Sequence, residues 1–169
     1  ELARALEEEG FSVLHDTTLY DYPSYNDAYD RSLEGVAALL EEHPTVRVVL
    51  DVHRDALEGE DGTVYKTMTE GTQAAQVMLV MGTDGNGLPH ERWRENLTLA
   101  VHLQRALNGD CPTLARPISL RGGRYNQQLS TGALLLEVGS HGNTLDEALS
   151  AVRLFARSAA EVLAPLREG

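Results

Sequence analysis

The sequence contains too little cysteine and too little positive charge for several common classes of function. One of its 169 residues is cysteine, Cys111, so no disulfide can close within the chain. Fourteen Lys and Arg residues stand against 26 Asp and Glu residues, which gives a net charge of −12. Nucleic acids and anionic membranes attract basic patches, so both are poor partners for this chain. No apolar run is long enough to cross a bilayer, and none has the pattern of a signal peptide.

Three motifs that mark common catalytic sites are also missing. The glycine-rich segment GTDGNG at 82–87 lacks the lysine of a phosphate-binding P-loop, so it does not indicate nucleotide binding. There is no G-x-S-x-G elbow, which carries the nucleophile of α/β-hydrolases, and no H-E-x-x-H helix of the zinc peptidases. Cys111 has no oxidoreductase motif around it and is expected to be a tolerated free thiol in a loop.

Apolar, β-branched segments alternate with amphipathic segments, which predicts one α/β domain over residues 1–169. The strand segments are apolar almost throughout, so we expect a mixed, mostly parallel sheet with helices on both faces. Strands are expected at 11–15, 46–53, 74–82, 114–120 and 133–139, the fourth at a sheet edge because Pro117 lacks a backbone donor. Helices are expected at 1–9, 27–42, 91–108 and 143–166, with a polar hairpin or excursion at 58–72.

Two polar residues stand out in the most apolar strands. His53 closes the segment VRVVLDVH at 46–53, and Glu137 interrupts LLLEVGS at 134–140. Carboxyl ends of parallel strands meet at one edge of a sheet, where such proteins place their active sites. An imidazole can ligate Zn²⁺ and a carboxylate can take a proton from zinc-bound water, so the pair suggests metal-assisted hydrolysis. A structural histidine and an ion pair closing the sheet are alternatives that stay open.

Further polar side chains are expected at the same edge of the sheet. Arg54 and Asp55 directly follow the strand that carries the histidine. A polar cluster at the end of so apolar a strand costs desolvation, which favours a functional role. Arg124 and Asn126 lie in a glycine-bearing loop that should emerge at this edge, where they could hold a substrate carboxylate or amide. A solvated loop without a binding role is the alternative for these two residues.

The other histidines give weaker indications. His15 ends the first expected strand and is a candidate for the wall of the site. Three others, His90, His102 and His141, lie in sequence contexts that are typical of surfaces.

The turn at 139–143 either presents backbone N–H groups to an anion or simply starts the last helix.

Several segments, taken together and in order, resemble the stage II sporulation protein P family. They are DVHRDA at 51–56, RYNQ at 124–127 and LLEVGS at 135–140, followed by GNTL and EA within 142–148. The resemblance covers nearly the whole chain and implies the α/β fold of the zinc-dependent N-acetylmuramoyl-L-alanine amidases of bacterial cell walls. The implied reaction cleaves peptidoglycan at the amide between the lactyl group of muramic acid and the first alanine of the stem peptide. An additional endopeptidase activity on peptide cross-links is also implied.

The same resemblance implies roles for residues, a cofactor and partners. It makes Zn²⁺ the cofactor, His53 a zinc ligand and Glu137 the catalytic residue, with substrate contacts expected at Arg54, Asp55, Arg124 and Asn126. In the family an upstream strand carrying HTH supplies the other zinc ligands, and the chain is expected to begin after that strand and a membrane anchor. The implied location is the space between mother cell and forespore, in septal wall thinning and engulfment, with stage II sporulation proteins D and M as partners. A metal-degenerate peptidoglycan-binding or scaffolding module is the alternative.

Overall fold

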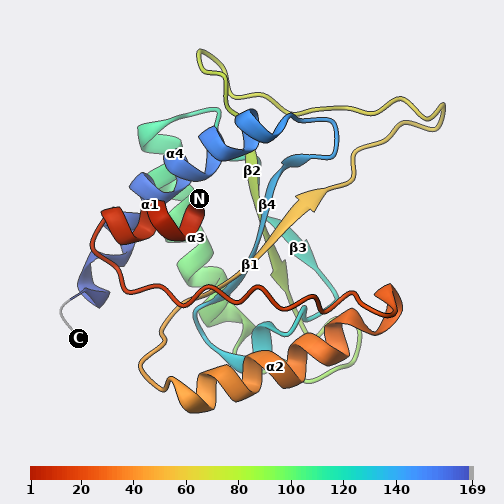
Figure 1. Cartoon of the computed structure of the whole chain (residues 1–169), viewed down its shortest axis with the longest axis vertical. Coiled ribbons are helices and arrows are strands. Elements are labelled where there is room, and N and C mark those ends of the chain that lie inside the picture. Colours follow the sequence, from red (N-terminus) through yellow and green to blue (C-terminus); the bar gives the residue numbers. More distant parts are fainter. Residues whose placement is uncertain (168–169) are drawn as a thin grey trace.

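A four-stranded sheet forms the centre of residues 1–167, the part of the chain that the computed structural model describes (Figure 1). The strands span Val49–Asp55 (β1), Val77–Gly82 (β2), Ser119–Arg121 (β3) and Ala133–Ser140 (β4). Their order in the sheet is β1-β4-β2-β3. β4 pairs in parallel with β1 and antiparallel with β2, while β2 pairs in parallel with β3. The mixed, mostly parallel sheet expected from the sequence is therefore confirmed.

Within the described residues, four α-helices and three short 3₁₀ helices surround the sheet. The α-helices span Leu2–Glu8 (α1), Ala28–Glu42 (α2), Trp93–Asp110 (α3) and Leu145–Leu163 (α4). The 3₁₀ helices span Tyr25–Asp27 (η1), Gln127–Leu129 (η2) and Ala164–Leu166 (η3). Each α-helix lies where the apolar periodicity predicts one. Among residues 1–167, no helix is both long enough and apolar enough to cross a membrane.

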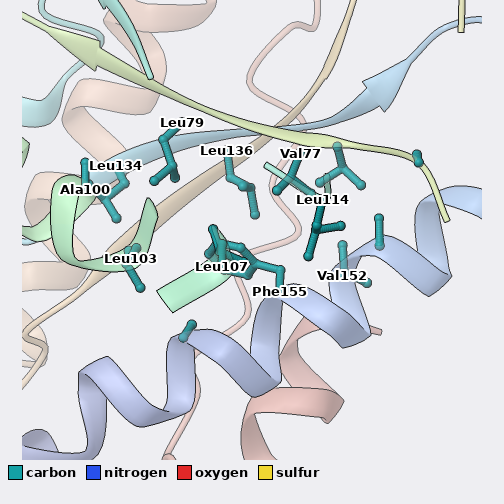
Figure 2. Packing of buried hydrophobic residues seen from close by; sticks show 14 of the residues in the cluster. Val77, Leu79, Ala100, Leu103, Leu107, Leu114, Leu134, Leu136, Val152 and Phe155 are labelled. Carbon is teal, nitrogen blue, oxygen red and sulfur yellow. The ribbon is translucent and has the colours of Figure 1, made fainter. Parts of the chain in front are cut away.

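The main hydrophobic core lies between one face of the sheet and helices α3 and α4 (Figure 2). Leu134 and Leu136 of β4 point into this core, so Glu137 points to the opposite face, as the alternation of a strand requires. Leu107 of α3 and Phe155 of α4 close the core from the helical side, and both are fully buried. Packing on one face of β4 thus determines on which face the carboxylate lies.

Helix α2 covers the opposite face of the sheet, but less tightly. None of its residues is buried, although Leu33, Val36 and Leu40 on its apolar side are partly shielded. The ring of Tyr29, in the first turn of α2, stacks on His53 of β1, which places this end of the helix over the sheet. Helices therefore lie on both faces, as expected, with most of the apolar burial on the α3 and α4 side.

Two of the expected strands need correction. The expected strand at 11–15 is wrong: this segment is extended but pairs with no other strand in the described structure. Phe11 and Val13 pack instead against a small apolar cluster of α1 and α4, so their apolar character serves a local contact. The strand expected at 114–120 does lie at the sheet edge, but Pro117 interrupts its ladder, and regular pairing is limited to β3.

The polar segment between β1 and β2 forms a long arm, residues 57–76, that projects from the body of the fold and returns to it (Figure 1). Backbone hydrogen bonds from Gly59 N to Thr63 O and from Tyr65 N to Leu57 O close its outer part as a hairpin. The expectation of a hairpin or excursion in this segment is confirmed. The returning part of the arm lies against the turn between β4 and α4.

Glu147 connects the arm to the first turn of α4. Its carboxylate accepts hydrogen bonds from Nζ of Lys66 at 2.7 Å and from Nδ2 of Asn143 at 2.9 Å. Thr144 and Glu147 also form a reciprocal capping box, in which each side chain accepts from the backbone N–H of the other. These donors, with Lys66 as the largest cause, lower the pKa of Glu147 to about 2. The turn before α4 is therefore a capped helix start.

Replacing Glu147 with Gln should destabilise the protein in a pH-dependent way. The folded-state pKa is depressed, so the ionised carboxylate stabilises the fold above its unfolded-state pKa of about 4.3, and this contribution disappears as the pH falls toward 2. The melting temperature of Glu147→Gln should lie below that of wild type at about pH 7 and approach it at about pH 2. Asp146→Asn, at an exposed carboxylate of the same turn, is the matched control and should show a smaller difference. A difference that does not change with pH would contradict the role of the charge.

Candidate active site

The parallel pairing of β1 with β4 places His53 directly opposite Glu137. Residues paired in register project from the same face of a sheet, and here that face is turned away from the main core. Asp51 lies two residues before the histidine and therefore shares this face. The structure thus brings together the two residues that the sequence singles out. Their chemical roles stay predictions.

Two neighbours hold the imidazole of His53. Its Nε2 lies 2.9 Å from Oδ1 of Asp51, and its ring stacks on that of Tyr29 with centroids 6.5 Å and planes 6° apart. The hydrogen bond with Asp51 raises the pKa of His53, against the opposing effect of burial. A carboxylate that holds one ring nitrogen fixes the orientation of the ring and leaves Nδ1 for another partner. Burial also raises the pKa of the Tyr29 hydroxyl, which stays protonated.

Sequence reasoning missed Tyr29, because this residue lies on a helix far from the strands that carry the site. Four of the six tyrosines of the chain fall within residues 20–29. Tyrosine combines an apolar ring with a polar tip, so such an enrichment could have indicated a surface that meets polar groups. The spacing alone gives no hint that one of these rings stacks on a strand histidine.

Glu137 is a half-buried carboxylate whose shielded oxygen has no hydrogen-bond partner. Burial is the main cause of its raised pKa, and the positive charges of His53 and Arg116 oppose this effect. Its Oε2 atom is shielded from solvent and accepts no hydrogen bond in the structure. Leaving a buried acceptor unpaired costs about 1–3 kcal/mol, and more for a charged group. A desolvated carboxylate of this kind suits a group that accepts a proton from a bound water or substrate.

The side chains of Arg54 and Asp55 both interact with other residues of the chain, Arg54 through hydrogen bonds and Asp55 through an ion pair. The ladder between β1 and β4 is irregular just before Asp55, as at a β-bulge. Arg54 donates from Nε to the carbonyl oxygen of Ser140 at 2.8 Å and from Nη2 to that of Asn143. Asp55 lies 2.8 Å from Nη1 of Arg116, and neither side chain is more than 20% exposed. These bonds fix the end of β1 and the turn after β4, and the expected substrate contacts of both residues stay predictions.

The loop between β3 and η2 reaches the same face of the sheet. Tyr125 and Asn126 both adopt left-handed backbone conformations, with φ of 49° and 55°. The side-chain amide of Asn126 donates to the carbonyl oxygen of Tyr29 at 2.7 Å, and Tyr125 lies edge-on to the Tyr29 ring at 5.8 Å. Arg124 donates to the carbonyl oxygen of Pro89 at 3.3 Å. The position expected for this loop, at the carboxyl ends of β1 and β4, is wrong: β2 and β3 run antiparallel to β4, so the loop after β3 leaves the sheet at the amino ends of β1 and β4. It meets the site through α2.

Two histidines do not lie where the sequence predicts them. His15 is exposed in the extended segment after α1, because the strand it was expected to end does not form. No contact described within residues 1–167 links it to the paired residues of β1 and β4. The surface position expected for His90 is wrong: this residue is 2% exposed, and burial lowers its pKa. His90 lies just before α3, where its carbonyl oxygen accepts a hydrogen bond from the backbone N–H of Trp93. Asn96, in the first turns of α3, is completely buried. His102 and His141 are exposed, as expected.

The donors around His53 are too few for a complete zinc site. A catalytic zinc ion takes about three protein ligands and a water. Among residues 1–167, no group of three or more His, Cys, Asp or Glu side chains is arranged to hold a metal ion. The neighbouring Asp51 carboxylate is bonded to the imidazole itself. The described residues therefore fit zinc only in part, through a single histidine.

Comparison with known sequences identifies relatives of this chain. The family model for stage II sporulation protein P matches residues 1–160. Stage II sporulation protein P of Bacillus subtilis (strain 168) is 30% identical over 129 residues, which cover 73% of this chain and 30% of the relative. The chain thus spans less than a third of the length of this curated relative.

Two solved structures share the fold at low sequence identity. The CwlD amidase from Clostridioides difficile, solved in complex with the GerS lipoprotein, aligns with a TM-score of 0.60 and 15% identity, covering 98% of this chain and 80% of that one. N-acetylmuramoyl-L-alanine amidase AmiC2 of Nostoc punctiforme aligns with a TM-score of 0.54 and 11% identity, covering 99% of this chain and 79% of that one. At these identities the likeness establishes the fold.

Asn126 should contribute to stability through both its side chain and its backbone conformation. Asn126→Ala removes the hydrogen bonds to Tyr29 O and Ser32 Oγ and places alanine at a φ of 55°. We expect this variant to lose about 2–3 kcal/mol of unfolding free energy, and Asn126→Gly, which tolerates the conformation, to lose about 1 kcal/mol. Urea denaturation measures both losses, with Asn108→Ala at an exposed position of α3 as the control. Equal losses in the two variants would contradict a contribution from the left-handed backbone.

Proposed function

Because the chain belongs to the stage II sporulation protein P family, we propose that it hydrolyses peptidoglycan during sporulation as an N-acetylmuramoyl-L-alanine amidase. The observation that carries the proposal is the buried, unpartnered carboxylate oxygen of Glu137, on the strand residue paired with His53. The fold shared with two proteins named as amidases supports it. The bond cleaved is the amide between the lactyl group of muramic acid and the first alanine of the stem peptide.

Glu137 moves the proton in the proposed reaction. Its carboxylate takes a proton from the attacking water as the water oxygen bonds to the amide carbon. The carboxylic acid then gives this proton to the alanine nitrogen as the C–N bond breaks, which leaves a carboxyl group on the muramic acid and a free amine on the peptide. The raised pKa of Glu137, caused mainly by burial, brings its basicity closer to the pH at which both transfers are efficient.

His53 and Asp51 form the second part of the proposed site. The hydrogen bond between them orients the imidazole toward one side of the sheet. We include zinc as the cofactor that the family resemblance implies, with His53 as one ligand. When bound at such sites, zinc lowers the pKa of its water and polarises a carbonyl group. Within residues 1–167, His53 is the only zinc ligand that we assign, whereas a catalytic zinc ion requires about three protein ligands.

The resemblance extends the proposal beyond the reaction itself. We propose an additional endopeptidase activity on peptide cross-links, and action in the space between mother cell and forespore during septal wall thinning and engulfment. Stage II sporulation proteins D and M are the proposed partners, and a membrane anchor outside residues 1–169 is the proposed attachment. The described chain corresponds to 30% of its curated relative, so these properties are proposals for the whole protein.

A peptidoglycan-binding or scaffolding module without catalysis is the second candidate. The incomplete donor set within residues 1–167 favours it. The buried Oε2 of Glu137 weighs against it, because binding alone does not require an unpaired carboxylate on this strand. Mass spectrometry of purified peptidoglycan after incubation with the protein separates the two, since only an amidase releases free stem peptides.

Glu137→Gln should reduce the release of stem peptides by about 10²- to 10⁴-fold, the usual cost of removing a general acid–base group. The variant should keep the wild-type melting temperature or exceed it, because it removes a partly buried charge. Release is measured by mass spectrometry, with the protein expressed together with any sequence that naturally precedes Glu1. Glu161→Gln, at an exposed carboxylate of α4, is the control. A variant at position 137 that keeps more than about a tenth of wild-type activity would refute the assignment.

In the protein expressed together with any sequence that naturally precedes Glu1, His53→Ala should lose bound zinc as well as activity. Elemental analysis after dialysis gives the zinc content per protein molecule, and His102→Ala, at an exposed position of α3, should keep the wild-type value. Asp51→Asn should bind zinc about 10- to 100-fold more weakly, because the carboxylate orients the imidazole. Normal zinc content in His53→Ala would exclude this residue as a ligand, and the absence of zinc from wild type would remove the metal from the proposal.

A further inference from the structure

Arg116 lies on the face of the sheet that carries Glu137. In the ladder, Glu137 pairs with Met78 of β2, and Ala115 bridges the neighbouring Val77. Arg116 follows this bridge, and its backbone N–H donates to the carbonyl oxygen of Val77 at 2.8 Å. Ala115 packs against the main core, so the next side chain points to the opposite face.

The side chain of Arg116 reaches across the sheet to β1. Its Nη1 atom lies 2.8 Å from Oδ2 of Asp55, in a pair that is only 16% and 20% exposed. β4 lies between β1 and β2 in the sheet, so the guanidinium spans the strand that carries Glu137. Burial raises the pKa of Glu137, and the charge of Arg116 is one of the effects that oppose this rise. Asp55 thus holds one corner of the guanidinium on the face of the sheet that carries Glu137.

Three polar atoms at this place lack partners. Nε and Nη2 of Arg116 and Oε2 of Glu137 are shielded from solvent and form no hydrogen bond within the described structure. Nε and Nη2 share one edge of the guanidinium, an edge that suits paired bonds to oxygen. In Arg92 the same two atoms hold both carboxylate oxygens of Glu95 at 2.7 Å. The unpaired atoms therefore call for a ligand with an acceptor for Arg116 and a donor for Glu137.

We propose that a peptide amide of the substrate binds between Arg116 and Glu137. Its carbonyl oxygen accepts from Nε and Nη2 of Arg116, and its N–H donates to Oε2 of Glu137. A carbonyl oxygen has two lone pairs, and the single N–H of a trans amide points to the opposite side, so an amide that lies between the two side chains offers partners to all three atoms. This inference rests on the proposed peptidoglycan hydrolase function and adds a contact with the stem peptide. The other oxygen of Glu137, Oε1, remains for proton transfer.

An amide fits this place better than a carboxylate. Asp51 and Asp55 already surround Glu137 with negative charge, and the charge of Arg116 is shared with Asp55. A carboxylate ligand would meet like charge and would leave Oε2 of Glu137 without a donor. A neutral amide adds no charge and supplies the missing donor. The arrangement therefore recognises the peptide backbone and not an anionic group of the wall polymer.

Arg116→Lys tests the unpaired edge of the guanidinium. Lysine keeps a positive charge near Asp55 but cannot present two parallel donors. For a soluble muramoyl peptide, kcat/KM should fall about 10- to 100-fold, mainly through a higher KM, as expected for charged hydrogen bonds. Thermal melting shows whether the variant is folded. Arg153→Lys, an exposed arginine paired with Glu1, is the matched control and should keep wild-type kinetics.

A second measurement uses only the wild-type protein and therefore does not depend on the folding of a variant. Synthetic muramoyl peptides carry an ester oxygen in place of one peptide N–H at a time, beyond the bond that is cleaved. An ester offers no N–H to Oε2 and is a weaker acceptor, so replacement at one position should raise KM about tenfold. A KM that is unchanged for every ester analogue overturns the amide contact, and so does a wild-type KM in folded Arg116→Lys. In either case, release of stem peptides by the wild-type protein would still support the proposed hydrolase function.

Failure of the proposed function has a different signature, which is the absence of released stem peptide with the wild-type protein. Isothermal titration calorimetry with the same peptides then tests the amide contact without turnover. The all-amide peptide should bind more tightly than one ester analogue to wild type but not to Arg116→Lys. Equal binding of all peptides to the wild-type protein overturns the inference.

Discussion

Parallel pairing between β1 and β4 is the constraint from which the geometry of the site follows. The pairing sets His53 opposite Glu137, and a slip of one residue would turn one of the two side chains toward the core. Two independent features hold this register. Leu134 and Leu136 fix which side of β4 is buried, and Arg54 binds carbonyl oxygens of the turn that follows β4. The pairing of His53 with Glu137 on the face under α2 is thus maintained by apolar packing on the other face of the sheet.

Two carboxylates on either side of the turn after β4, Glu137 and Glu147, show how burial can serve structure or chemistry. Both oxygens of Glu147 receive hydrogen bonds, and its pKa is lowered to about 2, so this side chain is held in its ionised form. Glu137 is half-buried, its shielded oxygen Oε2 receives no hydrogen bond, and its pKa is raised. A fully bonded carboxylate contributes to stability, whereas an unpaired one opposes it and keeps its basicity for a bound molecule.

The sequence predicts those features of the fold and the site that follow from local patterns. Apolar runs identify β1, β2 and β4, and two polar residues stand out in them, because His53 closes the run of β1 and Glu137 interrupts the run of β4. The segment 11–15 misleads because apolar residues that pack on a neighbouring helix look like those of a strand. The contributions of Tyr29 and Arg116 were not predictable, since a ring that stacks on a distant strand and a guanidinium that crosses a sheet leave no periodic signal.

Helix α2 differs from the other three α-helices in having no buried residue, which makes it the helix most open to local unfolding. β4 lies between two strands and against the core, so its amide hydrogens are expected to exchange with solvent only when the whole domain unfolds. Those of α2 can exchange through a local fluctuation that leaves the sheet intact. Each such fluctuation separates the Tyr29 ring from His53 and the Tyr29 carbonyl from Asn126. Local unfolding of helix α2 and exposure of the His53 imidazole are therefore the same event.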